Sequence, residues 1–125
     1  MSFVSLTPQK LSGALVLVDI GSIIYIQREK EFVVFHTIDG KSYYSMGTLK
    51  HWTYVFINTG FDFYICDRNS SVNINKIVGM NPITKHAYFN SDQSPNRLKC
   101  TMSQSGYMDV SKLLRERQAS VVFFQ

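Results

Sequence analysis

The stretch that decides the fold covers residues 61–77 and reads FDFYICDRNSSVNINKI. Phe61, Phe63 and Ile65 alternate with less apolar neighbours, which is the period of a half-buried strand. An unbroken polar run follows over Asp67–Ser71, and apolar spacing returns after it. The pattern predicts a strand that delivers a polar segment to the surface and is anchored again beyond that segment. An ordinary strand, loop and turn of a β domain fits the same pattern.

Composition favours one mainly β domain. The chain has 125 residues, of which 45% are hydrophobic and 14% aromatic, and aromatic residues favour strands. No apolar run approaches the roughly 20 residues that a membrane helix needs, and the N-terminus lacks the features of a signal peptide. We therefore expect a soluble, cytoplasmic protein without a membrane partner.

The charge balance is compatible with a polyanionic partner but does not require one. The formal net charge is +4 at pH 7, and the positive charges are dispersed along the chain.

The apolar spacing predicts the order of the elements. Strands are expected at 14–18, 23–26, 32–37, 41–44, 61–65, 77–80, 85–89 and 98–102, and helices at 48–57 and from 103 to about 117. Residues 27–31 are expected to form a charged connection and residues 90–96 a turn. The chain then divides into a lead-in (1–13), one domain (14–117) and an apolar tail (118–125).

Asp39-Gly40 separates two of these strands and predicts a β-hairpin, because such a turn calls for residues that tolerate positive φ.

These elements and their residues resemble the LytTR family of bacterial DNA-binding domains, over about Ile23 to Leu114. Four blocks carry the resemblance: Ile23-Ile24-Tyr25-Ile26-Gln27, His36-Thr37-Ile38-Asp39-Gly40, Thr48-Leu49-Lys50, and the set Phe63, Arg68, Val72, Asn73 and Ile77.

The resemblance implies an elongated, mainly β fold of small antiparallel sheets with two short helices. It also implies sequence-specific binding of double-stranded DNA by loops and element ends, in a transcriptional regulator of the response-regulator effector type. Two copies commonly bind repeated sites, so a homodimer on DNA is expected. Family members usually follow a receiver domain, and 125 residues do not include one.

Three segments match the family's DNA-facing positions. The residues implied to contact DNA are Arg28 and Lys30 in the first segment, Arg68 and Asn69 in the second, and Ser103, Gln104 and Ser105 in the third. Arginine and lysine reach guanine edges or phosphates, whereas glutamine suits adenine.

Each segment also has a simpler interpretation. The first is a solvated charged turn in which Glu29 and Glu31 would repel phosphate. Ser103 is also suited to cap the final helix. Gln104 stands where the family has arginine, so either the target sequence differs or reading at this position is lost.

The second segment departs from the family at two positions. Asp67 replaces a usual histidine and Asn69 a usual serine. Asp67 would pair with Arg68 or Lys76, or accept a hydrogen bond from cytosine. Asn73 is expected to hold the turn through side-chain-to-backbone bonds. These departures motivate the alternative function, a LytTR-like protein-interaction module that has lost DNA reading.

Cys66 and Cys100 lie outside any CxxC or metal-ligand spacing, so two buried free thiols are the simplest expectation. In the resembled fold their strands would be close, and the sharper hypothesis is a redox pair whose disulfide distorts the DNA-facing loop.

Catalysis is not expected. No nucleophile–base set, metal spacing or phosphate loop is present, so we expect no enzyme, metal, cofactor or small-molecule substrate. The apolar tail Val121–Phe124 would either pack on its own domain or dock on a second copy as an added strand.

Overall fold

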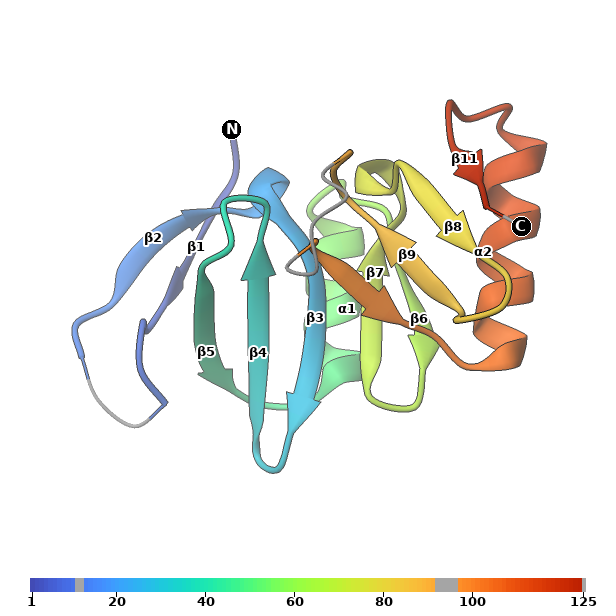
Figure 1. Cartoon of the computed structure of the whole chain (residues 1–125). Helices are drawn as coiled ribbons and strands as arrows, with labels where there is room; N and C mark the ends of the chain where they lie inside the picture. The colour runs from blue at the N-terminus through green and yellow to red at the C-terminus, as the bar shows by residue number, and fades with distance from the viewer. Residues whose placement is uncertain (11–12, 92–96, 125) are drawn as a thin grey trace.

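Strands dominate the protein, as its composition predicts. The structure is a computed structural model that describes residues 1–10, 13–91 and 97–124. In that part of the chain the strands form three sheets, which follow one another across the molecule, and two α-helices flank them (Figure 1). The predicted mainly β fold with two short helices is confirmed. The turn expected over 90–96 lies mostly outside the described residues.

In chain order, the elements are β1 (Phe3–Leu6), β2 (Val16–Asp19), the 3-10 helix η1 (Ile20–Ser22), β3 (Ile23–Glu29), β4 (Phe32–Thr37), β5 (Ser42–Met46), α1 (Leu49–Asn58), β6 (Phe63–Asp67), β7 (Ser70–Asn73), η2 (Ile74–Lys76), β8 (Gly79–Asn81), β9 (His86–Tyr88), β10 (Lys99–Thr101), α2 (Gln104–Glu116) and β11 (Val122–Phe123).

The central sheet has the order β5-β4-β3-β7-β6 and is antiparallel throughout. The second sheet has the order β10-β9-β8-β11, in which β11 runs parallel to β8. The third is the ribbon β1-β2, so the segment expected as a lead-in contains a paired strand.

Two hydrophobic cores share the central sheet. One lies under α1 and includes Phe35 and Phe56, and the other lies towards α2 and includes Val72 and Val110. Residues of β3 enter both cores, because its almost continuous apolar run places Ile24 in one and Ile23 and Ile26 in the other. Burial on both faces of this strand, which that run predicts, is confirmed.

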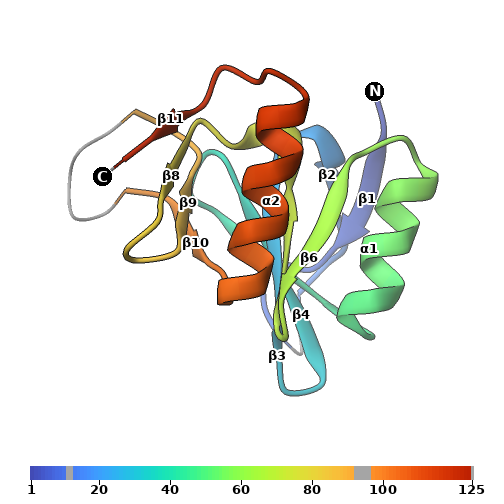
Figure 2. The same ribbon diagram turned by 90° about the vertical axis from the view of Figure 1, so that its right-hand side faces the viewer.

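Both helices begin at the same end of the molecule. Figure 2 shows α1 and α2 starting at the end where the β3–β4 and β6–β7 turns lie. Thr48 caps α1 by accepting from the N–H of His51 (3.0 Å), and Gly60 follows the helix with φ +103°. The predicted start and end of this helix are confirmed.

The hairpin at Asp39-Gly40 is present between β4 and β5, but its geometry differs from the expected one. Only Gly40 has positive φ (+82°), and the N–H of Thr37 donates to the carbonyl of Lys41 (2.9 Å). The connection is therefore a four-residue loop rather than a two-residue turn. Such a loop needs only one residue with positive φ, which is Gly40.

The polar run after β6 is shorter on the surface than the sequence suggests. A register shift lies between Ile65 and Asp67, and there Ile65 is 41% exposed whereas Cys66 is 1% exposed. Ser70–Asn73 forms a strand whose four residues are all buried. The prediction of a polar loop over 67–71 is wrong at its C-terminal half, because β7 pairs with both β3 and β6.

The charged connection predicted over 27–31 is also mostly strand. β3 continues to Glu29 and pairs with Phe32. Only Lys30 and Glu31 form the turn, with Lys30 in the left-handed region (φ +57°).

The apolar tail packs on its own domain. The N–H of Val122 donates to the carbonyl of Val78 (3.0 Å), and that of Phe124 donates to the carbonyl of Met80 (2.8 Å). Of the two alternatives left open by the sequence, this structure has the intramolecular one.

Candidate nucleic-acid interface

The three segments expected to face DNA lie at one end of the molecule and are joined by backbone hydrogen bonds. The N–H of Arg28 donates to the carbonyl of Asn69 (2.8 Å), which links β3 to the β6–β7 turn. The N–H of Ser103 donates to the carbonyl of Cys66 (3.2 Å), which links the start of α2 to β6. We call this end, formed by the β3–β4 turn, the β6–β7 turn and the first turn of α2, the basic edge.

The β3–β4 turn carries two of the predicted residues. The Nε of Arg28 donates to the carbonyl of Lys30 (3.3 Å), so this guanidinium braces its own turn. Lys30 is exposed at the tip.

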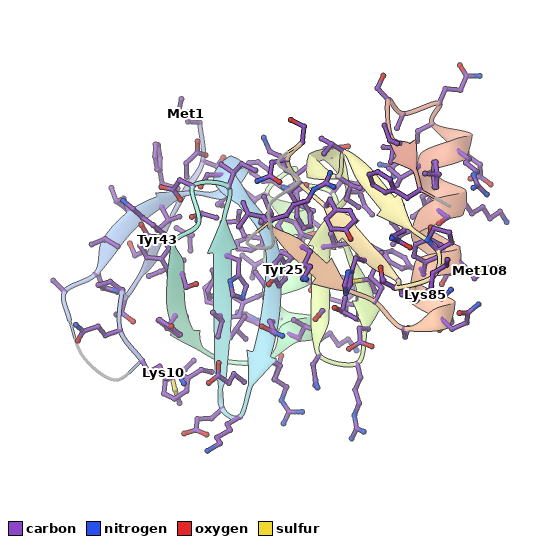
Figure 3. All side chains as sticks on the ribbon, in the orientation of Figure 1. Met1, Lys10, Tyr25, Tyr43, Lys85 and Met108 are labelled. Carbon is purple, nitrogen blue, oxygen red and sulfur yellow. The ribbon has the colours of Figure 1, made fainter. Side chains whose placement is uncertain are left out.

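The expected repulsion from glutamates is reduced in this turn. Glu29 forms an exposed ion pair with Lys10, a residue that the sequence did not connect with the site (Figure 3). The hydrogen bond from Lys10 lowers the pKa of Glu29, and the same contact raises the pKa of Lys10. Among the described residues Glu31 has no ion pair. Lys10 is 19 positions away from Glu29, and no local pattern predicts such a pair.

The β6–β7 turn presents Arg68 without a partner. Asp67 Oδ2 accepts from the N–H of Asn69 (3.3 Å), which closes the turn as an Asx-type bond. Among the described residues neither Asp67 nor Arg68 forms an ion pair, so of the alternatives for Asp67 the pairs with Arg68 and Lys76 are absent and the contact to cytosine stays a prediction. Arg68 is exposed at the tip, and none of its side-chain donors has a partner within the part of the chain that the structure describes.

Asn73 supports this hairpin from its far end. Its side-chain Nδ2 donates to the carbonyl of Ile23 (3.0 Å) and it is 2% exposed. The predicted side-chain-to-backbone bond is present, but it ties β7 to β3 rather than holding the turn.

Ser103 is the N-cap of α2, as one of the two interpretations predicts. Its Oγ accepts from the N–H of Gly106 (3.0 Å) and donates to the carbonyl of Cys66 (3.3 Å). Gln104 and Ser105 follow in the exposed first turn. The positive end of the helix dipole therefore lies beside the β6–β7 turn.

Gly106 permits this close approach. A Cβ at this position would lie 1.8 Å from the carbonyl oxygen of Cys66, so any larger residue would separate α2 from β6. The sequence analysis missed this residue. A glycine inside a segment with helical spacing is the feature that points to it.

Cys66 and Cys100 are both free, and each is 1% exposed in the same hydrophobic core. The neighbouring Cys100 thiol and burial raise the pKa of Cys66. The expected proximity of their two strands agrees with this contact, whereas the redox function stays a prediction.

No helix of the described residues is long and apolar enough to cross a membrane. No group of three or more His, Cys, Asp or Glu residues in this part of the chain is arranged to hold a metal ion.

Comparisons with known proteins agree with the fold. The family model for the LytTr DNA-binding domain matches residues 13–115. The chain therefore belongs to the LytTR family of DNA-binding domains, and its general role is DNA binding in transcription regulation. No curated protein sequence matches significantly.

Among solved structures, one similar chain is the LytTr DNA-binding domain of a methyl-accepting/DNA response regulator from Bacillus cereus. The TM-score is 0.67 at 21% identity, and the match covers 91% of this chain and 97% of that chain. At this identity the likeness shows the fold.

Proposed function

We propose that the protein binds a specific double-stranded DNA sequence through the basic edge and thereby regulates transcription. The observation that carries the proposal is the unpaired guanidinium of Arg68 at the tip of a hairpin that is hydrogen-bonded on both sides to the other two segments. Prior ordering of a binding surface lowers the entropy cost of association. The edge has cations and the N-terminus of a helix, both of which suit phosphate and base acceptors.

The three segments differ in the contacts they can make. Lys30, at an exposed tip, suits a phosphate contact, which supplies affinity without sequence information. Arg68 has a free planar fork that fits guanine O6 and N7, and Gln104 fits adenine N6 and N7. Asn69 and Ser105 offer shorter polar groups beside them. We infer that specificity comes mainly from Arg68 and Gln104.

Selection of bound fragments from genomic DNA, followed by measurement of binding against salt, tests the proposal. We expect one enriched motif and a linear fall of log K with log salt, because phosphate contacts release counterions. Absence of any retarded fragment at low salt would contradict DNA binding and favour the alternative, a protein-interaction module.

The number of copies on DNA is a second part of the proposal. We infer that two molecules occupy repeated sites, and that β11, which is folded on its own domain, is not the contact between them. Mass measurement of the complex on a one-site and a two-site duplex tests this. A single copy on both duplexes would contradict it.

We also infer that oxidation of Cys66 and Cys100 to a disulfide would act on the basic edge. The carbonyl of Cys66 accepts from both the N–H and the hydroxyl of Ser103, so movement of Cys66 would move the start of α2. Burial and the raised pKa of Cys66 disfavour the reactive thiolate, and we therefore expect slow oxidation. Mass spectrometry after mild peroxide treatment tests this, and two persistently free thiols would dismiss it.

A further inference from the structure

A groove of about 660 Å³ lies between the outer face of α2 and the tail strand β11. This volume falls within the roughly 300–1,000 Å³ range of small-molecule sites. Figure 3 shows Met108 and Lys85 on this flank. The lining residues that matter below are Tyr107, Met108, Ser111, Arg115, Phe123 and Phe124.

The groove has an aromatic lining that is already ordered. Phe123 and Phe124 belong to the tail, which is hydrogen-bonded to β8 through Val122 and Phe124. A Cβ on Gly79 would lie 2.9 Å from the Phe124 ring, so the lack of a side chain at Gly79 leaves room for this ring. Both phenylalanines lie beyond residues 13–115, the part that matches the family, and the groove is therefore not contained in the matched region alone.

Two cations flank this lining without a carboxylate partner. The guanidinium carbon of Arg115 lies 4.3 Å from the centre of the Phe123 ring, and among the described residues Arg115 forms no ion pair. Lys85 Nζ lies 5.2 Å from the centre of the Tyr107 ring. The ammonium of Lys85 donates a hydrogen bond to the backbone carbonyl of Pro82.

Two carboxylates, those of Asp109 and Glu116, also line the groove. Glu116 lies 3.9 Å from the ammonium of Lys112. Asp109 Oδ2 accepts from the neutral hydroxyl of Tyr64 (2.8 Å), which leaves its negative charge in place. Arg115 and Lys85 therefore exceed the remaining carboxylate charge by one positive charge.

Ser111 adds an unsatisfied polar group to the wall. The residue is 5% exposed, and its buried Oγ has no hydrogen-bond partner among the described residues. Buried hydroxyl groups are normally hydrogen-bonded, so this hydroxyl offers a free hydrogen-bonding group to a ligand that it can reach after rotation about χ1.

We propose that this groove binds a small organic anion with an apolar body, of the aryl or medium-chain carboxylate class. The aromatic lining takes the apolar body, the Arg115 guanidinium takes the carboxylate, and the hydroxyl of Ser111, after rotation about χ1, takes a carboxylate oxygen. Charge-assisted bonds to arginine are the strong contact in this set. The proposal does not depend on DNA binding.

An NMR titration of the isotope-labelled protein tests it, with 3-phenylpropionate and octanoate as probes and their neutral amides as matched ligands. We expect saturable shifts at α2 and β11 with the acids, and roughly tenfold weaker binding of the amides. Arg115→Ala should weaken binding of the acids by a similar factor and leave binding of the amides unchanged. The matched control is Lys76→Ala, which removes one exposed cation outside the groove and should change the affinity for neither ligand.

Three results would overturn the proposal: no saturable shift with either acid, equal binding of acid and amide, or shifts confined to the exposed leucines Leu15, just before β2, and Leu17, on β2. Arg115 is exposed, so its variant is expected to fold, and an unchanged reference spectrum verifies this.

Discussion

The two hairpins of the basic edge look alike in sequence and differ in what they leave available. Each has a two-residue turn and an arginine, which lies two residues before the turn in the first hairpin (Arg28) and within the turn in the second (Arg68). In the β3–β4 hairpin the Nε of Arg28 donates to its own turn and Glu29 is paired with Lys10. In the β6–β7 hairpin Asp67 closes the turn through the N–H of Asn69 and leaves Arg68 unpaired.

This difference teaches that the net charge of a turn does not predict which charge is free. An acidic residue near a basic tip need not pair with the neighbouring cation when the backbone engages its carboxylate, as with Asp67. A basic residue contributes less to recognition when its donors are already engaged, as with Arg28.

The largest expected effect comes from removing the contact that fixes α2 beside the β6–β7 hairpin. Gly106→Ala would place a Cβ 1.8 Å from the Cys66 carbonyl oxygen. We expect a loss of about 3 kcal/mol or more in the free energy of unfolding, since neither backbone can yield cheaply. Denaturant unfolding measures it.

Lys112→Ala is the control for Gly106→Ala, because that side chain is exposed on the same helix and its ion pair with Glu116 is a surface pair of little weight. A stable Gly106→Ala protein with unchanged DNA binding would show that the close approach is not needed.

The second prediction compares the two arginines directly. Arg68→Ala should weaken specific DNA binding by about 1–3 kcal/mol, and Arg28→Ala should weaken it less, because the Arg28 guanidinium braces its own turn. Fluorescence anisotropy on the selected duplex measures both, with Lys76→Ala as the control beyond the far end of β7. A larger loss for Arg28→Ala would reverse the comparison.

The third prediction uses a half-buried histidine on β4, for which the β6–β7 hairpin has no counterpart. His36 on β4 stacks on Tyr25 (4.3 Å between ring centres), and burial lowers its pKa to about 4. Because the folded pKa lies below the unfolded value of about 6.5, stability is complete above that pH and falls as pH drops from 6.5 towards 4.

We expect this fall to be on the order of 1–3 kcal/mol, measured by thermal unfolding against pH. His36→Phe should remove this part of the pH dependence while keeping the stacking on Tyr25. An unchanged pH profile in that variant would show that another group titrates.

The smallest expected effect concerns the exposed pair beside the β3–β4 turn. Lys10→Ala would free the charge of Glu29 next to DNA and should weaken binding slightly, by less than Arg68→Ala. Adding Glu29→Gln should restore part of the lost DNA affinity. Measurement of DNA affinity as a function of salt concentration tests the single and the double variant. Failure of the double variant to recover would mean that Lys10 contacts phosphate itself.

Local sequence patterns were sufficient for most elements of this protein. The strand Phe32–Thr37 and the caps Thr48 and Ser103 follow from spacing and from side chains that satisfy free N–H groups. Such features depend on neighbours within four residues, and a single sequence records them fully.

Patterns failed where distant segments override local preference. Ile65 alternates as a buried residue would, yet it is 41% exposed beside the register shift of β6. Ser70 and Ser71 read as loop residues, yet β7 lies between two strands and buries them, and the hydroxyls of Ser71 and Thr53 lie 2.9 Å apart.

The sequence by itself determined the mainly β class, the order of the elements and the family resemblance, and it indicated Arg68. Only the tertiary structure decided that Arg68 is unpaired, that Lys10 neutralises Glu29 and that Gly106 brings α2 against Cys66. The reason is physical: strand and helix preferences act between near neighbours, whereas the availability of a charge depends on which distant donor or acceptor the fold brings beside it.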